Sequence, residues 1–284
     1  MHKLFEGYER IVTLGPEGTF SNQAATLVGG DRIRRIDYTV TLPQIVKEVV
    51  ADPKALGVLP IENSSSGIVG PAQDSLVESE VVIIAELQIA VSYALVSQVP
   101  LEEIESFYCH AVAFDQIMTF TANHLSQAQV IYADSNMNAA QQFAAEPQGS
   151  KRAAVIPKVV ANQDERFEGL ILAEQIEDYQ NNSTRFAVVK RIPVPYQPDF
   201  KRKKTSLVVE THEDRHSLLF ELLREFHVFS INLCRLESRP SKAHAWQYRF
   251  FIDFYNNHRT AACLEALSGA GIHYKLLGTY SSLT

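Results

Sequence analysis

The chain has 284 residues, of which 46% are hydrophobic and 21% are charged, and its formal net charge is −7. This length suits two or three compact units, and the composition is that of a globular protein, which excludes a disordered chain. The negative charge argues against a general nucleic-acid-binding protein, so we expect no nucleic acid partner. The longest apolar runs, such as VVIIA from Val81, are too short to span a bilayer, so we expect no membrane partner.

Two further features concern the compartment. The amino-terminal stretch MHKLFEGYERIV has neither the apolar core nor the cleavage site of a secretory signal. The cysteines Cys109, Cys234 and Cys263 show neither paired nor metal-type spacing, and the sequence contains no P-loop and no GxGxxG loop. We therefore expect a cytoplasmic protein with reduced thiols.

Residues 1–191 show strands and helices in alternation, which is typical of an α/β unit. A strand is expected at RIVTL from Arg10, followed by a glycine turn and an apolar helix from Ser21. The runs from Ala55 and Val81 supply further strands, and the same alternation continues to the end of the unit.

The sharpest change in composition lies at residues 192–204. This stretch contains Pro193, Pro195 and Pro198, followed by the four adjacent cations KRKK. Prolines disfavour a sheet interior and neighbouring cations resist burial, so we expect a solvated linker. The charge run favours a solvated surface over a nucleic-acid site.

Residues 205–284 carry the order strand, helix, strand, strand, helix, strand. The helices are expected at HSLLFELLREFH and TAACLEALSGAG. One side of the third strand is apolar at alternate positions, and its residues are Trp246, Tyr248, Phe250, Ile252 and Phe254. This order predicts a ferredoxin-like βαββαβ unit, with helices on an antiparallel sheet.

Two segments place polar side chains where a strand gives way to a turn. In LGPEGTFSNQAA, Thr19 and Ser21 can cap a helix whose exposed amides attract a carboxylate or phosphate, and plain capping is the alternative. In GVLPIENSSSGIVG, polar residues from Glu62 onward follow a strand at its carboxyl end, where open α/β sheets bind ligands. A loop that bonds to itself is the alternative there.

A third segment, NNSTRF, sets the hydroxyl of Thr184 beside the guanidinium of Arg185 just before a short apolar strand. Arginine has a fork of donors suited to a carboxylate, and threonine can donate to an oxygen. A turn closed by a salt bridge is the alternative interpretation.

Together these segments resemble the prephenate dehydratase family, whose members make phenylpyruvate from prephenate. The family string GPxGTFS is present from Gly15 to Ser21, PIENS from Pro60 to Ser64, and NxTRF from Asn182 to Phe186. Beyond the linker, INLCRLESRP resembles the NLTxIESRP string of the ACT domain, a regulatory βαββαβ unit. The strings occur in the family's order and cover nearly the whole chain.

The resemblance implies a catalytic domain at residues 1–191 with two α/β lobes, similar to a periplasmic binding protein. Lobe one takes about residues 1–85 and 170–191, and lobe two takes about 86–169. A linker at 192–204 and an ACT domain at 205–284 follow.

The resemblance also implies roles for individual residues. Thr184 is the expected catalytic residue, as a hydrogen-bond donor to the departing hydroxyl of prephenate. It is expected to point into the cleft between the lobes together with Arg185, which would lie against a substrate carboxylate. The expected substrate-binding residues are Thr19, Phe20, Ser21, Glu62, Asn63, Ser64, His110, Gln116, Arg185 and Phe186. No cofactor and no metal are expected.

Phenylalanine is the expected effector, bound where two ACT domains meet. The residues expected there are His216, Ser217, Leu218, Leu219, Asn232, Leu233, Glu237, Ser238, Arg239 and Pro240. His216 stands in HSLL where the family has the glycine of GALL. A homodimer or homotetramer is implied, and the sheet edges of the unit favour the same conclusion.

Three alternatives stay open. One is an arogenate dehydratase, and another is a non-aromatising prephenate decarboxylase, because CHAVAFDQI from Cys109 replaces the family string SHPQALAQC. The remote alternative is a non-catalytic sensor of an amino acid or prephenate, since two α/β lobes also describe solute-binding proteins. A sensor has no use for the threonine of NSTRF.

Overall fold

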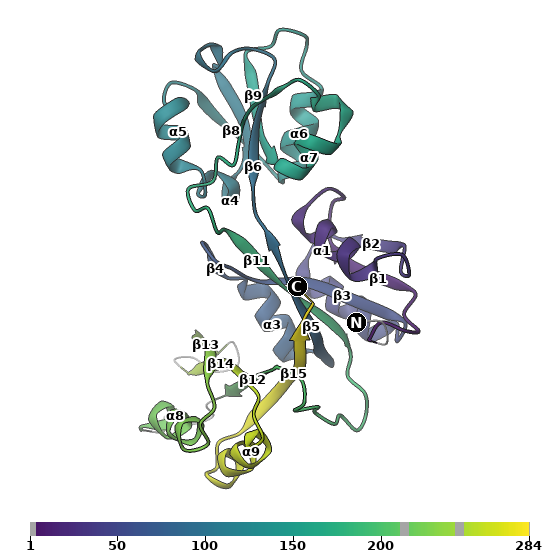
Figure 1. Ribbon diagram of the computed structural model, residues 1–284, viewed down its shortest axis with the longest axis vertical. Helices are drawn as coiled ribbons and strands as arrows, with labels where there is room; N and C mark the ends of the chain where they lie inside the picture. The colour runs from purple at the N-terminus through teal and green to yellow at the C-terminus, as the bar shows by residue number, and fades with distance from the viewer. Residues whose placement is uncertain (1–3, 211–215, 242–246, 284) are drawn as a thin grey trace.

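The computed structural model describes residues 4–210, 216–241 and 247–283, and it is elongated, with three parts along its long axis (Figure 1). A lobe around a small sheet lies at one end, a lobe around part of a larger sheet lies in the middle, and the carboxyl-terminal unit lies at the other end. Among the described residues, no helix is long and apolar enough to cross a membrane.

The larger sheet has ten strands and runs through both the middle lobe and the carboxyl-terminal unit. In spatial order its strands are β13 (Leu233–Pro240), β14 (Tyr248–Tyr255), β12 (Lys204–Glu210), β15 (Tyr274–Ser282), β5 (Val81–Ala90), β11 (Ser183–Arg191), β3 (Ala55–Asn63), β1 (Arg10–Leu14) and β2 (Arg35–Thr39), and β4 (Gly67–Ile68) pairs with β3. In lobe one, α1 (Phe20–Gly29) packs on one face of this sheet, and α2 (Leu42–Ala51) and α3 (Gly70–Glu78) pack on the other.

Lobe two is built on the smaller, five-stranded sheet. Its strands are, in spatial order, β10 (Ile171–Glu174), β6 (Tyr93–Ser97), β9 (Arg152–Pro157), β7 (Ser106–His110) and β8 (Gln129–Ala133). The helices of this lobe are α4 (Ala111–Phe114), α5 (Met118–His124), α6 (Asn136–Ala144) and α7 (Lys158–Gln163), with short 3₁₀ turns η1 (Leu101–Glu103) and η2 (Glu165–Phe167). The helices enclose a separate core on each face of the sheet. Two α/β lobes are thus confirmed.

The chain crosses between the lobes twice, after β5 and again before β11. The two crossing strands pair antiparallel down to Ala90 and Ser183, so β5 stays in the larger sheet beyond residue 85. The return crossing begins later than expected as well, because β10 pairs with β6 of lobe two. Both expected lobe boundaries therefore shift by a few residues, since pairing between strands decides where a lobe ends.

The carboxyl-terminal unit has the predicted ferredoxin-like order β13-β14-β12-β15, with α8 (Leu218–Val228) and α9 (Thr260–Gly269) on one face. Phe250, Ile252 and Phe254 pack under these helices as expected, while Trp246 lies outside the described residues. The opposite face is apolar as well, and its Val208 and Phe251 share a core with α3. This unit is therefore docked on lobe one through a sheet face.

The sheet of this unit also continues into lobe one, because β15 pairs parallel with β5. One sheet edge that was expected to need a second chain is thus covered within the same chain. Residues 192–203 connect β11 to β12 without a helix or strand. Lys204, expected in the solvated linker, instead begins β12 and lies 2.6 Å from Glu86, because that buried carboxylate supplies its counter-charge.

Gly278 lies where β15 meets β5 and allows the close approach of the two strands. A Cβ atom at residue 278 would lie 2.2 Å from the carbonyl oxygen of Ile83 and 2.8 Å from its amide nitrogen. Both are backbone atoms of a paired strand, so they cannot rotate away as a flexible side chain would. The φ of 155° at Gly278 is also one that other residues rarely adopt.

We expect Gly278→Ala to lower the free energy of unfolding by at least about 1–3 kcal/mol, the usual cost of comparable backbone strain. Urea denaturation followed by circular dichroism measures this change. The matched control is Gly269→Ala at the end of α9, where an added Cβ meets no described atom within 4 Å. That control should be neutral or stabilise by up to about 1 kcal/mol. Equal stability of the two variants would contradict the close approach of β15 and β5.

Candidate active site

The segments NST and ENS lie side by side on two paired strands of the sheet, at the crossing between the lobes, and each pair of opposite residues forms one rung of the sheet. Thr184 on β11 pairs with Asn63 on β3, and Arg185 pairs with Glu62. Because successive residues of a strand point to opposite faces, the two rungs present their side chains to different sides of the sheet. The Asn63–Thr184 rung lies on the side of lobe two.

Asn63 is the centre of the polar network on this side. Its Oδ1 accepts hydrogen bonds from the backbone amides of Ser65 and Ser66, at 2.9 and 2.8 Å. Its Nδ2 donates toward Thr184 Oγ1 at 3.0 Å and Asn182 Oδ1 at 3.0 Å, with the carbonyl oxygen of Ser183 at 3.2 Å. The side chain is buried, so its amide orientation is set by these partners.

The Thr184 hydroxyl is held as an acceptor, and this leaves its own hydrogen available. Its oxygen accepts from Asn63, and among the described residues the hydroxyl donates no hydrogen bond of its own. The side chain is half-buried, so solvent reaches it only in part. A hydroxyl oriented in this way can donate to an oxygen atom of a bound ligand.

The same network extends into lobe two through Gln116. Asn182 Nδ2 donates to Gln116 Oε1 at 2.6 Å, and Gln116 Nε2 donates to Ser66 Oγ at 3.1 Å. Gln116 is 3% exposed, so it serves here as a link between the lobes. Ser64 ties the crossing segment to β3, since its Oγ accepts from the Ser183 amide at 2.9 Å.

A cavity of about 580 Å³ lies between the lobes. The lobe-one residues that line it are Leu14, Gly15, Pro16, Thr19, Ser21, Tyr38, Thr39 and Val40. From lobe two, His110, Asp134, Ser135 and Asn136 line it. Thr19, Ser21 and His110, expected from the sequence, therefore come together around one cavity.

Thr184, Asn63 and Gln116 are not among the residues that line this cavity, and the Thr184 network is linked to the cavity wall through lobe two. His110 lines the cavity just before α4, and Gln116 follows that helix and joins the network. The helix has four residues and is about 6 Å long. The two groups of residues therefore lie on neighbouring parts of the same interlobe region.

Asp134, Ser135 and Asn136 were missed in the sequence. They follow β8 directly, in QVIYADSN, and thus lie at the carboxyl end of a parallel strand next to His110 at the end of β7. Open α/β sheets bind ligands at the carboxyl ends of their strands, and this rule, which predicted a site at ENS, also predicts one at this segment. Ser135 also caps α6, and its Oγ accepts from the Asn138 amide at 3.0 Å.

The GTFS turn caps α1 in the way its sequence suggests. Thr19 Oγ1 accepts from the Asn22 amide at 3.3 Å, and Gly18 at the turn has a φ of 86°. Phe20 turns away from the cavity and packs edge-on against Tyr93, with ring centroids 5.8 Å apart. It therefore joins the lobes by an apolar contact between them.

The His110 side chain is half-buried at the cavity wall. Burial lowers the pKa of His110 below its ordinary value, and the nearby Asp134 only partly offsets this. This burial favours the neutral imidazole, which can bind a ligand by hydrogen bonds.

Three sequence expectations need correction at this site. Arg185 does not point into the cleft with Thr184, because neighbouring residues of β11 face opposite sides; its guanidinium contacts Asp253 at 2.6 Å. Glu62 lies beside Arg185, with 3.0 Å between Oε2 and Nη2. Phe186 is 1% exposed and packs in the lobe-one core under α1, so it is a core residue and not a ligand contact.

The described residues offer no group of three or more His, Cys, Asp or Glu side chains that could hold a metal ion. The polar groups that line the cavity are hydroxyls, the Asn136 amide, the His110 imidazole and the Asp134 carboxylate, next to the starts of α1 and α6. Such groups suit a ligand that carries carboxylates and hydroxyls.

Comparisons with known proteins agree on one family. A family model described as prephenate dehydratase matches residues 11–193. A prephenate dehydratase of Methanocaldococcus jannaschii is 33% identical over 272 residues, which cover 93% of this chain and 95% of that protein.

Solved structures give the same result. The crystal structure of the prephenate dehydratase from Staphylococcus aureus subsp. aureus Mu50 has a TM-score of 0.80 at 26% identity, with 96% of this chain and 99% of that chain covered. A prephenate dehydratase from Arthrobacter aurescens, in complex with L-Phe, also has a TM-score of 0.80, at 29% identity, with 96% of this chain and 90% of that chain covered.

The fold defines the class, an α/β protein with two lobes that carries a ferredoxin-like unit at its carboxyl end. The chain belongs to the prephenate dehydratase family, because the family model matches well over half of it and the relatives match nearly all of it. It is accordingly a carbon–oxygen lyase of the hydro-lyase type.

Proposed function

We propose that the enzyme converts prephenate into phenylpyruvate at the interlobe cleft, with Thr184 as the catalytic residue. The observation that carries this proposal is the Thr184 hydroxyl itself. It is oriented by Asn63 at 3.0 Å, and its hydrogen is uncommitted among the described residues. A donor oriented in advance can stabilise charge that develops only in the transition state.

The chemistry of prephenate explains why one oriented donor can matter so much. The ring carboxylate leaves as carbon dioxide, and the electrons of its bond to the ring form a new π bond. The ring hydroxyl leaves at the same time and takes up a proton to give water. The product ring is aromatic, so the driving force lies in the substrate, and the enzyme has to orient it and stabilise the departing oxygen.

The cavity offers two places for the two carboxylates of prephenate. The first turn of α1 in lobe one, after the cap Thr19, and the first turn of α6 in lobe two, after the cap Ser135, both begin at its wall. The amino-terminal ends of helices carry partial positive charge and free N–H groups, which bind anions. Two helix ends from opposite lobes thus favour a dianion in a protein whose net charge is −7.

Feedback regulation by phenylalanine at the carboxyl-terminal unit, taken as an ACT domain, is part of the proposal. The bound L-Phe of the Arthrobacter aurescens relative supports it. Among the expected effector residues, Arg239 faces α3, where its Nη1 donates to the carbonyl oxygen of Gly70 at 2.7 Å and lies 3.2 Å from Asp74. The effector strand β13 is thus in direct contact with the catalytic domain.

The other expected effector residues differ in their surroundings, since Leu218 and Leu233 pack against the core of the unit. His216, Leu219 and Asn232 are exposed, and Ser217 adopts a left-handed conformation with a φ of 63° before α8. A homodimer or homotetramer is part of the proposal, because β13 forms the outer edge of the ten-stranded sheet. The cytoplasmic location expected from the sequence stays a prediction.

An assay of the purified protein with prephenate, in the presence and absence of phenylalanine, tests the proposal. We expect an aromatic product, phenylpyruvate, and a lower rate when phenylalanine is present. Faster turnover of arogenate than of prephenate would instead identify an arogenate dehydratase. A non-aromatic product would identify a decarboxylase, and binding without turnover would contradict an enzymatic role.

A further inference from the structure

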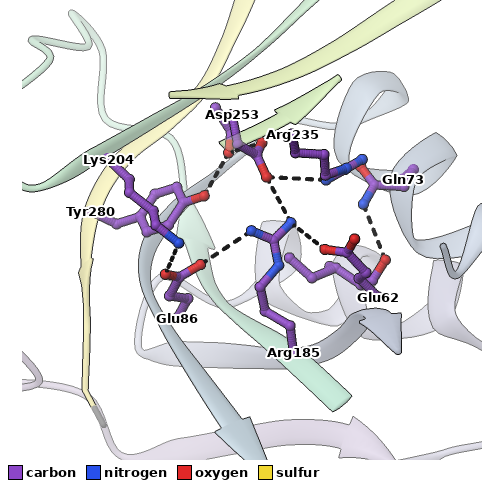
Figure 2. A network of polar contacts seen from close by, with 10 residues as sticks. Glu62, Gln73, Glu86, Arg185, Lys204, Arg235, Asp253 and Tyr280 are labelled. Atoms are coloured by element: carbon purple, nitrogen blue, oxygen red, sulfur yellow. Dashed lines mark hydrogen bonds and ion pairs between the residues drawn. The ribbon is translucent and has the colours of Figure 1, made fainter. Parts of the chain in front are cut away.

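A cluster of six charged side chains lies where the carboxyl-terminal unit meets lobe one (Figure 2). Each comes from a different strand of the larger sheet, and they are Glu62 of β3, Glu86 of β5, Arg185 of β11, Lys204 of β12, Arg235 of β13 and Asp253 of β14. Three cations and three carboxylates balance in this cluster, so the two domains share one ionic core.

Arg185 is at the centre of this cluster, as Figure 2 shows. Its Nη2 lies 2.6 Å from Asp253 and 3.0 Å from Glu62, and its Nη1 lies 3.4 Å from Glu86. Its side chain is only 10% exposed. It thus joins lobe one to the carboxyl-terminal unit, and it follows Thr184 directly on β11.

In the carboxyl-terminal unit, Asp253 is the side chain that forms the ion pair with Arg185. It is 2% exposed, accepts a hydrogen bond from Ser206 Oγ at 2.6 Å, and lies 3.3 Å from Arg235 of the effector strand. Burial alone would raise the pKa of Asp253, but Arg235 and Arg185 outweigh it and hold the pKa below its ordinary value. The carboxylate is therefore charged and joins β13 to β11.

Stability alone does not account for this cluster. Buried ion pairs contribute little more than apolar packing would, because the charges lose their hydration. The donors are also incompletely used, since Nε and Nη2 of Arg235 and Nε of Arg185 have no hydrogen-bond partner in the described part of the protein. Specifying the relative position of packed elements is a better attested role for such groups.

Near Thr184, the position of β11 depends more on side-chain contacts than it would in a strand with an uninterrupted ladder of backbone hydrogen bonds. Its pairing with β3 is irregular between Arg185 and Phe186, where Ile61 is an extra residue on β3. A bulge of this kind interrupts the ladder of hydrogen bonds and lets the strand bend. Asn63 then holds Thr184 from the cleft side, and Asp253 holds Arg185 from the other side.

We propose that Arg185 and Asp253 are positioning residues, through which the carboxyl-terminal unit sets the position of the Thr184 hydroxyl. The inference rests on the proposed function and adds to it the route between effector and cleft. Arg235 pairs with Asp253 in the register of β13 and β14, so a shift of the effector strand moves the carboxylate. Arg185 follows the carboxylate, and Thr184 moves with it as the next residue of the strand.

The test compares Asp253→Asn with the wild-type enzyme. The readout is the ratio of the phenylalanine Kd values measured by calorimetry with and without saturating phenylpyruvate, the unreacting product. Coupled sites typically change each other's affinity by about 5–150-fold. We expect the wild type to lie in that range and Asp253→Asn to bring the ratio close to one. The kcat with prephenate should fall about tenfold or more with a smaller change in KM, because misplaced groups slow chemistry before they weaken binding.

Two further variants allow the inference to be tested if Asp253→Asn alone does not fold. Asp253→Asn combined with Arg235→Gln removes one charge of each sign, so the cluster stays balanced while the link to Arg185 is lost. Ser206→Ala removes the 2.6 Å hydrogen bond to Asp253, together with the 2.6 Å hydrogen bond between Ser206 and the Tyr280 hydroxyl, and keeps every charge. We expect the double variant to lose the coupling and Ser206→Ala to weaken it, with the fold checked by circular dichroism.

Lys275→Gln is the matched control. The Lys275 ammonium on β15 also joins the carboxyl-terminal unit to lobe one, by donating to the carbonyl oxygens of Val77 at 2.6 Å and Ser79 at 2.8 Å, but it does not touch β11. The control should lower stability and keep the coupling ratio. Folded variants without the Asp253 carboxylate that keep the wild-type ratio would overturn the inference. A wild type without turnover or phenylalanine binding would instead contradict the proposed function.

Discussion

Thr184→Val is expected to lower kcat at least about a hundredfold, with a much smaller change in KM. Valine has nearly the same shape as threonine but no hydroxyl, so the fold and the pairing of β11 with β3 are kept. The departing hydroxide then loses a donor that acts mainly in the transition state, and removal of one such donor costs about 10²–10³ in kcat. Steady-state kinetics with prephenate measure the change.

Thr184→Ser is the control for this result. Serine keeps the hydroxyl and the hydrogen bond from Asn63 Nδ2, so it should retain most of the activity. Near-wild-type turnover by the valine variant would remove Thr184 from the mechanism. Loss of activity in the serine variant as well would indicate that the methyl group and not the hydroxyl is what matters.

Asn63→Asp should have the next largest effect. Aspartate keeps an oxygen for the amides of Ser65 and Ser66, so the loop after β3 is preserved. It has no donor for Thr184 Oγ1, and the threonine hydroxyl would then turn its hydrogen toward the carboxylate and away from the substrate. A lost hydrogen bond of this kind costs about 1–3 kcal/mol, or roughly 5- to 150-fold in kcat.

A matched asparagine is available for comparison in the carboxyl-terminal unit. Asn257 Nδ2 donates to the carbonyl oxygens of Phe229 and Ser230, and its Oδ1 accepts from the Arg259 amide at 2.7 Å. Asn257→Asp should therefore lower thermal stability and leave kcat unchanged. If both aspartate variants lower kcat equally, the effect of Asn63→Asp reflects general destabilisation.

Much of the candidate site could be read from short strings because each string is a local structure. GPEGTFS predicts a turn and a helix cap, and the structure has Thr19 in that role. ENS and NST were both expected at the cleft, and they lie side by side at the crossing between the lobes because β3 pairs with β11. The DSN segment after β8 obeys the same strand-end rule and was missed, although it lines the cavity opposite the GTFS turn.

The direction of the Arg185 side chain shows that a short sequence motif does not predict which groups its side chains contact. Adjacent residues of an extended strand point to opposite faces, and this alone rules out a common target for Thr184 and Arg185. The actual target also requires Asp253 and Glu86, which lie far away in the sequence. Lys204 was assigned to solvent for the same reason, since its charge is matched only by Glu86 across the sheet.

The sequence by itself determined the two α/β lobes, the ferredoxin-like unit and the cap of α1 in the GTFS turn, since periodicity, turns and capping are local properties of the chain. The tertiary structure alone decided that the sheet of the carboxyl-terminal unit continues into lobe one, and that Arg185 belongs to an ionic core between the domains. It also placed Gln116 as a link between the lobes. These features depend on the pairing of strands distant in sequence, and pairing is set by the burial of whole faces and the matching of charges across them.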